Sequence, residues 1–242
     1  VTPARARTAA PISVRWQVTT DSSARALGKS GTVTTSSTQN FTVKVDVTGL
    51  EPGRTYLYLF EAEGEQSPTG RTRTLRATAA RAQLAVVSCA NYPGGYFNAY
   101  AALAARDELD AVLHLGDYIY EGERTKADLE ARAFPAEELH ELDDYRIRYA
   151  IYKHDPALQA AHAMAPWIVT WDDHEVNNDY ANDRSETLDP DFLLRRAAAY
   201  RFCHTSRAGN SPSPQSAANQ MRQSAANQQA DGGAQASPEC TE

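Results

Sequence analysis

The sequence predicts two successive domains, an all-β domain over residues 11–76 and an α/β domain over residues 83–203. The first prediction rests on short runs between residues 12 and 62 in which apolar and polar residues alternate, as in half-buried strands. The second rests on continuous apolar runs that alternate with helical segments from residue 83 onward, as in a parallel sheet. Residues 204–242 contain no Val, Ile, Leu, Phe, Tyr or Trp, so we expect a disordered tail that buries too little apolar surface to offset its ordering entropy.

Alternation predicts the strands of the first domain. ISVRWQV (residues 12–18) places its apolar residues on one face, and FTVKVDV (41–47) alternates in the same way. TYLYLFEA (55–62) follows GLEPGR, in which Pro-Gly is a strong turn signal. Strands at this spacing indicate a small β-sandwich, and GLEPGRTYLYLF resembles the turn and tyrosine-bearing strand of fibronectin type III-like domains. RTRTLRATAARA (71–82) looks like a linker, with residues 77–82 lying between the two domains.

The α/β domain is predicted to contain three buried strands, QLAVVSC (83–89), LDAVLHLGD (109–117) and PWIVTWDD (166–173). Because these runs are continuously apolar, we expect both faces of their sheet to be covered. Helices are predicted over NAYAALAARDE (98–108), within residues 137–163, and from Pro156 as a further short helix. A last helix, DPDFLLRRAAAYRF (189–202), has Asp189 as N-cap and Pro190 at its first position. The acid-rich stretch from Glu121 to Asp144 is typical of a solvated helical surface.

Composition limits the function classes. The chain has 242 residues, 42% hydrophobic and 23% charged, as expected of a globular protein. Its net charge of −7 argues against a dedicated nucleic-acid face. No run of 18 apolar residues predicts a transmembrane helix, and the arginine-containing first residues include no apolar core of a signal peptide. The scattered cysteines Cys89, Cys203 and Cys240 form no disulfide framework. Cys89 is read either as a buried structural thiol or as a thiolate ligand of a metal.

Polar residues gather where the three predicted strands of the second domain end, near Cys89, Asp117 and Asp172. The carboxyl ends of parallel strands share one edge of a sheet, and ligands bind there. Carboxylates and a phenolate are hard donors that suit Ca²⁺, Mg²⁺, Mn²⁺ or Fe³⁺. Each residue alone also has an ordinary structural explanation, such as a turn, a helix cap or a packed ring. Their coincidence at three consecutive strand ends favours a metal site.

Three segments, SCANYPGGYFNAY (88–100), GDYIYE (116–121) and WDDHEVNNDY (171–180), together resemble the alkaline phosphatase D (PhoD-like) family. That family belongs to the wider metallophosphoesterase fold and carries a small β domain before its catalytic domain. The resemblance covers roughly residues 11–202. It implies that residues 83–203 form the first half of a metallophosphoesterase-like domain. The GDxxY spacing is shared with purple acid phosphatases, in which the tyrosine binds ferric iron.

The resemblance also implies roles for individual residues and a metal centre that holds Fe³⁺ and one or two Ca²⁺. Cys89 resembles a thiolate ligand of iron, and Tyr120 a phenolate ligand. Asp117 resembles the carboxylate that bridges the two metals, and Asp173 a ligand of the second metal. His174 corresponds to the catalytic histidine that stabilises or protonates the region of the leaving group. Asn91 replaces a histidine of the wider fold, and Asp172 and Asn177 are weaker candidates.

The implied function is a metal-dependent phosphatase that acts on small phosphomonoesters or phosphodiesters, phospholipid head groups included. The resemblance further implies a monomer that is secreted, periplasmic or on the cell surface. After residue 202 no further ligand motif of the family is found, so the chain resembles a truncated or frameshifted copy. We therefore expect the chain as written to be inactive or nearly so, with exposed apolar strands that favour aggregation. The alternative functions are a non-catalytic fragment and an interaction module built on residues 11–76.

Overall fold

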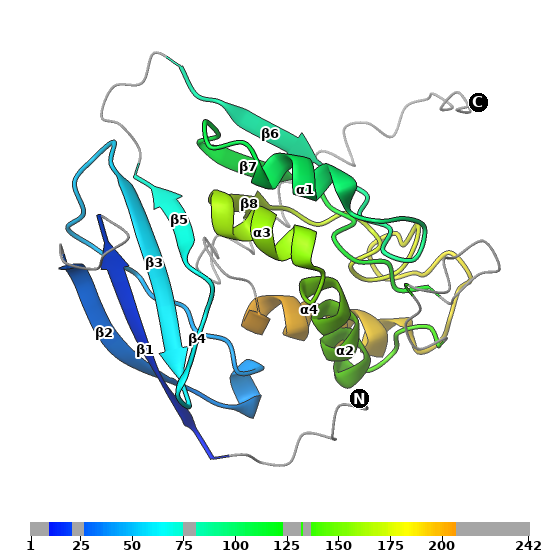
Figure 1. The fold of residues 1–242 in the computed structure, drawn as a ribbon. Helices are drawn as coiled ribbons and strands as arrows, with labels where there is room; N and C mark the ends of the chain where they lie inside the picture. The colour runs from blue at the N-terminus through cyan, green and yellow to red at the C-terminus, as the bar shows by residue number, and fades with distance from the viewer. Residues whose placement is uncertain (1–9, 21–26, 75–80, 123–131, 133–136, 207–242) are drawn as a thin grey trace. The chain divides into compact units, whose positions relative to one another are not determined.

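The computed structural model describes residues 10–20, 27–74, 81–122, 132 and 137–206 (Figure 1). Most of the predicted linker, residues 77–82, lies outside these ranges. So does the predicted tail, residues 204–242, apart from residues 204–206, which continue the last helix. No helix within the described ranges is long and apolar enough to cross a membrane.

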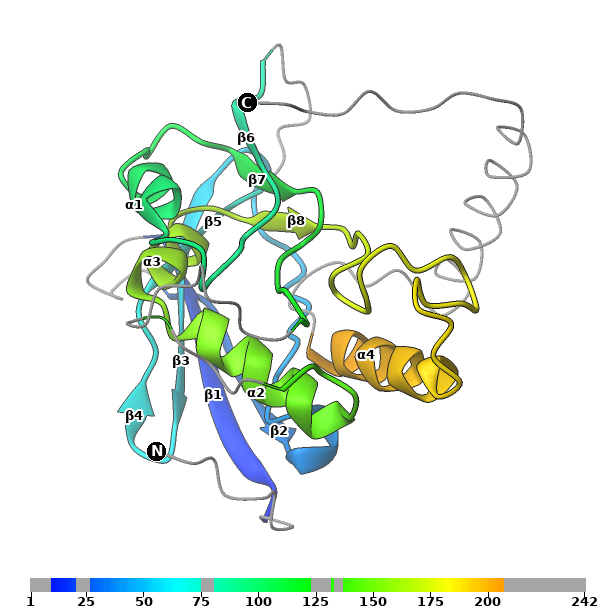
Figure 2. The same ribbon diagram turned by 90° about the vertical axis from the view of Figure 1, so that its right-hand side faces the viewer.

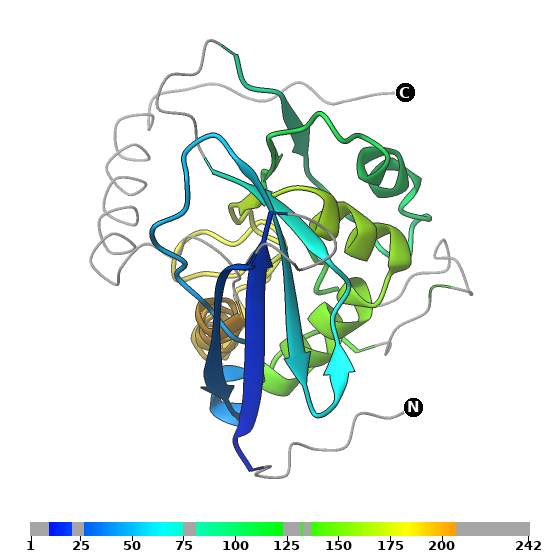
Figure 3. The same ribbon diagram turned by 60° about the vertical axis from the view of Figure 1, so that its left-hand side comes forward.

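The N-terminal region is one antiparallel sheet (Figure 3). The strands are β1 (Ile12–Thr19), β2 (Leu27–Thr35), β3 (Thr55–Ala62), β4 (Glu65–Gln66) and β5 (Gly70–Arg73), with a short 3₁₀ helix, η1 (Ser37–Gln39), after β2. The order is β2-β1-β3-β4, and β5 pairs with β3. Val14 and Val18 are buried, as the alternation in β1 predicts. The predictions for β1 and β3 are confirmed, while the assignment to a fibronectin type III-like domain stays a prediction.

The strand predicted over residues 41–47 is wrong. Asn40 and Phe41 both have positive φ, 53° and 52°, in a turn after η1, and no residue of this stretch belongs to a strand. The side chains still alternate between partly buried and exposed. However, a strand also needs a hydrogen-bonded neighbour, and both edges of β1 are taken by β2 and β3. The sequence reading missed β2 because LGKSGTVTT, rich in Gly, Ser and Thr, lacks a clear apolar alternation.

The linker predicted over residues 71–82 is wrong for its first residues, which form β5. Arg71 donates from Nε to the carbonyl oxygen of Met164 at 2.6 Å. Arg73 pairs with Asp110 at 2.7 Å. The end of the first sheet is therefore bonded to the α/β region rather than being a free connection.

The second sheet is parallel, with the order β6 (Leu84–Val87), β7 (Ala111–His114), β8 (Trp167–Val169). Its helices are α1 (Asn98–Ala104), α2 (Leu142–Lys153), α3 (Pro156–Met164) and α4 (Phe192–Ser206). This confirms the predicted alternation of strands and helices. Asp155 caps α3 by accepting from the backbone N–H groups of Ala157 and Leu158, and Pro156 is its first residue, as predicted.

Helix α4 begins at Phe192, not at Pro190 as predicted. Leu188 has φ of +57°, so the chain turns just before the expected cap. Asp189 accepts from the N–H of Asp191 at 2.9 Å, which closes a turn ahead of the helix. The proline therefore lies in this turn rather than in the first position of α4.

The parallel sheet is covered on one face, where α1 and α3 lie (Figures 1 and 2). On and next to its other face, four large apolar side chains are between 49% and 59% exposed: Leu84, Val86, Leu115 and Ile168. The prediction that both faces are covered is therefore wrong for the described part of the chain. The core lies on the covered side and is mainly aromatic, with Tyr145, Tyr152 and Phe192 almost fully buried. It supports the loops that leave the carboxyl ends of the strands.

Candidate metal centre

The loops after β6 and β7 are bonded to each other where the strands end. The N–H of Cys89 donates to the carbonyl oxygen of Gly116 at 3.2 Å, and that of Ala90 donates to Asp117 at 2.8 Å. Cys89 and Asp117 both adopt positive φ, 56° and 55°, which non-glycine residues rarely do outside constrained sites. Gly116, with φ of +114°, must be glycine, because a Cβ there would lie 2.8 Å from the backbone of Trp171.

Asp117, Asp173 and His174 form the centre of the site. Each offers one ligand atom, and these atoms lie within 4.8 Å of one another. Oδ1 of Asp117 is buried and has no hydrogen-bond partner. Burial raises the pKa of Asp117, the charges of Asp173 and Asp172 add to this, and His174 opposes it. A buried carboxylate oxygen without a partner is costly, and a cation would satisfy it, so this donor set suits a metal ion.

Tyr120 and Cys89 complete the predicted ligand set. The hydroxyl of Tyr120 donates to Oδ2 of Asp117 at 3.2 Å. The thiol of Cys89 lies near both side chains and acts on the pKa of Asp117 and of Tyr120. Cys89 is exposed, so the buried structural thiol is excluded as its explanation. Burial, followed by the negative charge of Asp117, raises the pKa of Tyr120, so a phenolate here requires a nearby cation.

Asp173 is held by the backbone of its own loop. Its Oδ1 accepts from the N–H of His174 at 3.0 Å, and its Oδ2 from Asp179 at 2.6 Å. Burial disfavours its charge, but the bond from Asp179 and the charge of His174 outweigh this and lower its pKa. The weaker candidates differ: Asp172 is exposed and outside the cluster, whereas Asn91 and Asn177 line the neighbouring pocket.

Glu175 joins the loops after β7 and β8. It is 1% exposed and accepts the backbone N–H groups of Tyr118 (2.5 Å), Asp117 (3.2 Å) and Asp172 (2.9 Å). Burial raises its pKa despite these bonds. The sequence placed Glu175 beside the cluster but gave it no role, because its partners lie in a distant loop.

The interpretation of residues 121–144 as a solvated helical surface is wrong for Glu121, which is 2% exposed and precedes α2. Oε2 of Glu121 contacts Nδ1 of His174 at 2.7 Å, and Oε1 accepts from the N–H of Asn178 at 2.5 Å. Burial disfavours the imidazolium form of His174, but the bond to Glu121 and its charge outweigh burial and raise the pKa of His174. Residues 123–131 and 133–136 of this stretch lie outside the described ranges.

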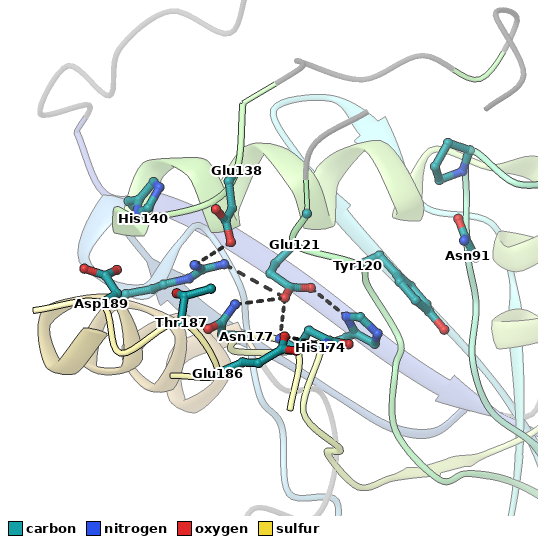
Figure 4. A pocket seen from close by; sticks show the side chains of 14 residues that line it. Asn91, Tyr120, Glu121, Glu138, His140, His174, Asn177, Glu186, Thr187 and Asp189 are labelled. Carbon is teal, nitrogen blue, oxygen red and sulfur yellow. Dashed lines mark hydrogen bonds and ion pairs between the residues drawn. The ribbon is translucent and has the colours of Figure 1, made fainter. Parts of the chain in front are cut away.

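A pocket of about 590 Å³ opens beside the cluster and shares Tyr120 and His174 with it (Figure 4). The ring of Tyr120 lies over that of His174, with centroids 4.1 Å apart. Arg195 from α4 also lines the pocket, is 4% exposed and pairs with Glu138 at 2.6 Å. Other titratable side chains that line the pocket are Glu121, His140, Glu186 and Asp189. The arrangement provides space for an organic group beside His174, whose Nε2 is not used by the contact with Glu121.

Comparison with known proteins gives consistent results for both regions. The family model described as "PhoD-like phosphatase" matches residues 84–206, and that of the "PhoD-like phosphatase, N-terminal domain" matches residues 1–76. Alkaline phosphatase D of Bacillus subtilis (strain 168) is 42% identical over 199 residues, which cover 78% of this chain and 34% of that protein. A solved structure titled "Structure of PhoD" is 40% identical, with a TM-score of 0.75 over 81% of this chain and 39% of its own. The chain thus spans between a third and two fifths of the length of these relatives.

Proposed function

The chain belongs to the PhoD-like phosphatase family of phosphoesterase hydrolases, and on that premise we propose that its strand-end cluster is the metal centre of a phosphate-ester hydrolase. Two observations carry the proposal: Oδ1 of Asp117 is buried without a hydrogen-bond partner, and ligand atoms of Asp117, Asp173 and His174 lie within 4.8 Å of one another. An acidic cluster of this kind is unfavourable without a counter-charge. A cation held by the carboxylates of Asp117 and Asp173 would offset the cost.

The donors differ in character, which supports two different cations. The thiol of Cys89 and the phenol of Tyr120 both lie next to Asp117 and suit Fe³⁺ when ionised. Asp173 offers carboxylate oxygens only, as Ca²⁺ prefers. Asp117 would hold both ions as a bridging carboxylate. When bound, such ions stabilise charge on phosphoryl oxygens and activate water for in-line attack.

His174 acts as the general acid that protonates the leaving group. Its imidazolium form, favoured by Glu121, donates the Nε2 proton to the alcohol oxygen while the bond from phosphorus to that oxygen breaks. The products are an alcohol, phosphate and a neutral histidine. The pocket beside His174 receives the alcohol portion of a small phosphate ester. Phosphodiesters and phospholipid head groups are further substrates to test. Family resemblance supports a location outside the cytoplasm, as a secreted, periplasmic or cell-surface protein.

A limited turnover is expected of the 242-residue chain by itself. Ca²⁺ alone takes about six to eight oxygen ligands, and the described donors are Cys89, Asp117, Tyr120 and Asp173, with water. We expect hydrolysis of p-nitrophenyl phosphate well below the enzyme median of about 10 per second.

The test combines metal analysis with hydrolysis. The chain is loaded with Fe³⁺ and Ca²⁺, and retained metal and p-nitrophenyl phosphate hydrolysis are measured before and after chelation. We expect retained metal and a slow rate that chelation abolishes. His174→Ala should keep the metals and lower the rate by about 100-fold or more, the usual contribution of a general acid. Absence of retained metal, or a rate that chelation leaves unchanged, would contradict the proposal.

A further inference from the structure

We propose that Glu121 is a positioning residue, which fixes His174 with Nδ1–H directed at its carboxylate and Nε2 directed at the substrate. The inference rests on the proposed function for the role of His174, but not for the geometry. The two residues are 53 positions apart, in the loops that follow β7 and β8. Oε2 of Glu121 lies 2.7 Å from Nδ1 of His174.

The carboxylate of Glu121 is held in place without help from His174. Its Oε1 accepts from the backbone N–H of Asn178 at 2.5 Å and from Nδ2 of Asn177 at 3.3 Å. Arg195 lies 4.0 Å from the same oxygen. These contacts hold Oε1 in place and thereby orient the carboxylate, so that Oε2 is directed at Nδ1 of His174. A buried carboxylate with 2% exposure needs such partners, because it has lost its hydration.

The imidazole ring of His174 is constrained from two more sides. Tyr120, the residue before Glu121, lies over the ring with an interplanar angle of 31°. The backbone N–H of His174 donates to Asp173 at 3.0 Å. Flipping the ring would place a carbon against Glu121 and lose the 2.7 Å contact. One segment of chain, Tyr120 with Glu121, therefore sets both the plane and the rotation of the histidine.

This arrangement determines which nitrogen carries the exchangeable proton. An ionised Glu121 can only accept, so Nδ1 of His174 must be the donor. The charged and neutral forms of the ring then differ only in whether Nε2 bears a proton. When Nε2–H protonates a leaving alkoxide, the product is the Nδ1–H tautomer, which Glu121 already holds. No ring flip or exchange of tautomers is needed between turnovers.

The test is Glu121→Gln, with Glu138→Gln as matched control. Glu138 lines the same pocket and pairs with Arg195, but no bond joins it to His174. In Glu121→Gln the amide oxygen can still accept the hydrogen bond from the N–H of Asn178. The amide NH₂ then faces Nδ1 of His174. His174 must then accept at Nδ1 and carry its proton on Nε2.

The readout is the ¹⁵N chemical shifts of the His174 ring in the metal-free 242-residue chain, at a pH where the ring is neutral. We expect the Nδ1–H tautomer in the unaltered chain and in Glu138→Gln, and the Nε2–H tautomer in Glu121→Gln. In loaded protein, Glu121→Gln should lower kcat by about 10–100-fold, a typical loss for an outer-shell partner, with KM and bound metal unchanged.

Two results would overturn the inference. One is an Nε2–H tautomer in the unaltered chain, which needs no variant and so does not depend on whether Glu121→Gln folds. The other is an Nδ1–H tautomer that persists in Glu121→Gln. Neither result depends on hydrolysis. A chain with the expected tautomers but no retained metal would reject the proposed function and leave the positioning of His174 intact.

Discussion

The carboxylate of Glu175 accepts the backbone N–H of Tyr118 at 2.5 Å, across 57 residues of sequence. The same carboxylate accepts from Asp117 and Asp172. One buried side chain thus holds together two loops that carry the candidate metal ligands, and this connection can be tested separately from the ligands themselves.

Glu175→Ala should destabilise the metal-free chain. The change leaves backbone N–H groups buried without an acceptor, at about 1–3 kcal/mol for each unsatisfied donor. Because water can enter the space, we expect a total loss of about 2–4 kcal/mol in the free energy of unfolding, measured by urea denaturation. Glu65→Ala, at an exposed residue of β4, is the control and should change little. Equal midpoints for the two variants would show that Glu175 does not join the loops.

Asp117→Asn should have opposite effects on the stability of the metal-free chain and on metal binding. Burial, with the charges of Asp173 and Asp172, raises the pKa of Asp117, so its ionised form costs stability at neutral pH. The amide removes this charge and keeps an oxygen for the hydroxyl of Tyr120. We expect a higher thermal midpoint in the absence of metal and loss of most bound metal.

The matched control for that comparison is Asp183→Asn, in the exposed turn between Ala181 and Arg184. It should leave thermal midpoint and metal content unchanged. If Asp117→Asn kept its full complement of metal, Asp117 could not be the bridging ligand.

Iron bound between Tyr120 and Cys89 should colour the protein. Phenolate and thiolate ligands transfer charge to Fe³⁺ in the visible range, and both side chains contact Asp117. Tyr120→Phe should remove the phenolate part of the visible band while leaving the ring over His174. A colourless chain with stoichiometric iron would reject both residues as ligands.

Acid should destabilise the fold through His114. Its ring is fully buried, accepts the N–H of Gly116 at Nδ1, and has a pKa lowered by burial from 6.5 to about 4. The unfolded chain binds a proton below pH 6.5, whereas the folded chain does not until about pH 4. The contribution is therefore complete above pH 6.5 and declines as the pH falls toward 4, by up to about 1.4 kcal/mol per pH unit.

The measurement is the urea midpoint between about pH 7.5 and about pH 4.5, a range that spans the titration of the histidine in the unfolded chain. His114→Asn keeps an acceptor for Gly116 and should show a flatter dependence on pH. His154→Asn, at an exposed residue after α2, should retain the full dependence. If the urea midpoints of the unaltered chain and of His114→Asn changed with pH in parallel, His114 would not be the source of the pH dependence.

Local patterns in the sequence were sufficient for much of this fold. Alternation located β1 and β3, continuous apolar runs located β6, β7 and β8, and parallel pairing placed their ends at one edge. Cys89, Asp117, Tyr120, Asp173 and His174 therefore converge as predicted, because strand order alone brings their loops together. The failure at residues 41–47 has a physical cause. Alternation reports which side of an extended chain is buried, but not whether another strand is there to bond it.

Glu121 and Glu175 could not be assigned from local sequence. Acidic residues are rarely buried, so an acid-rich stretch is ordinarily read as surface. Their burial depends on donors more than 50 residues away, including Asn178 for Glu121 and Tyr118 for Glu175. A pairwise signal from related sequences could identify such partners, whereas composition and periodicity cannot.

The half-exposed side chains of Leu84, Val86, Leu115 and Ile168 also have a thermodynamic consequence. The heat capacity of unfolding is set mainly by apolar surface that is dry in the folded state and hydrated in the unfolded state. These residues are already largely hydrated, so they contribute little to that change. The free energy of unfolding of the described α/β region should accordingly vary less steeply with temperature than that of a region of equal length whose sheet is buried on both sides.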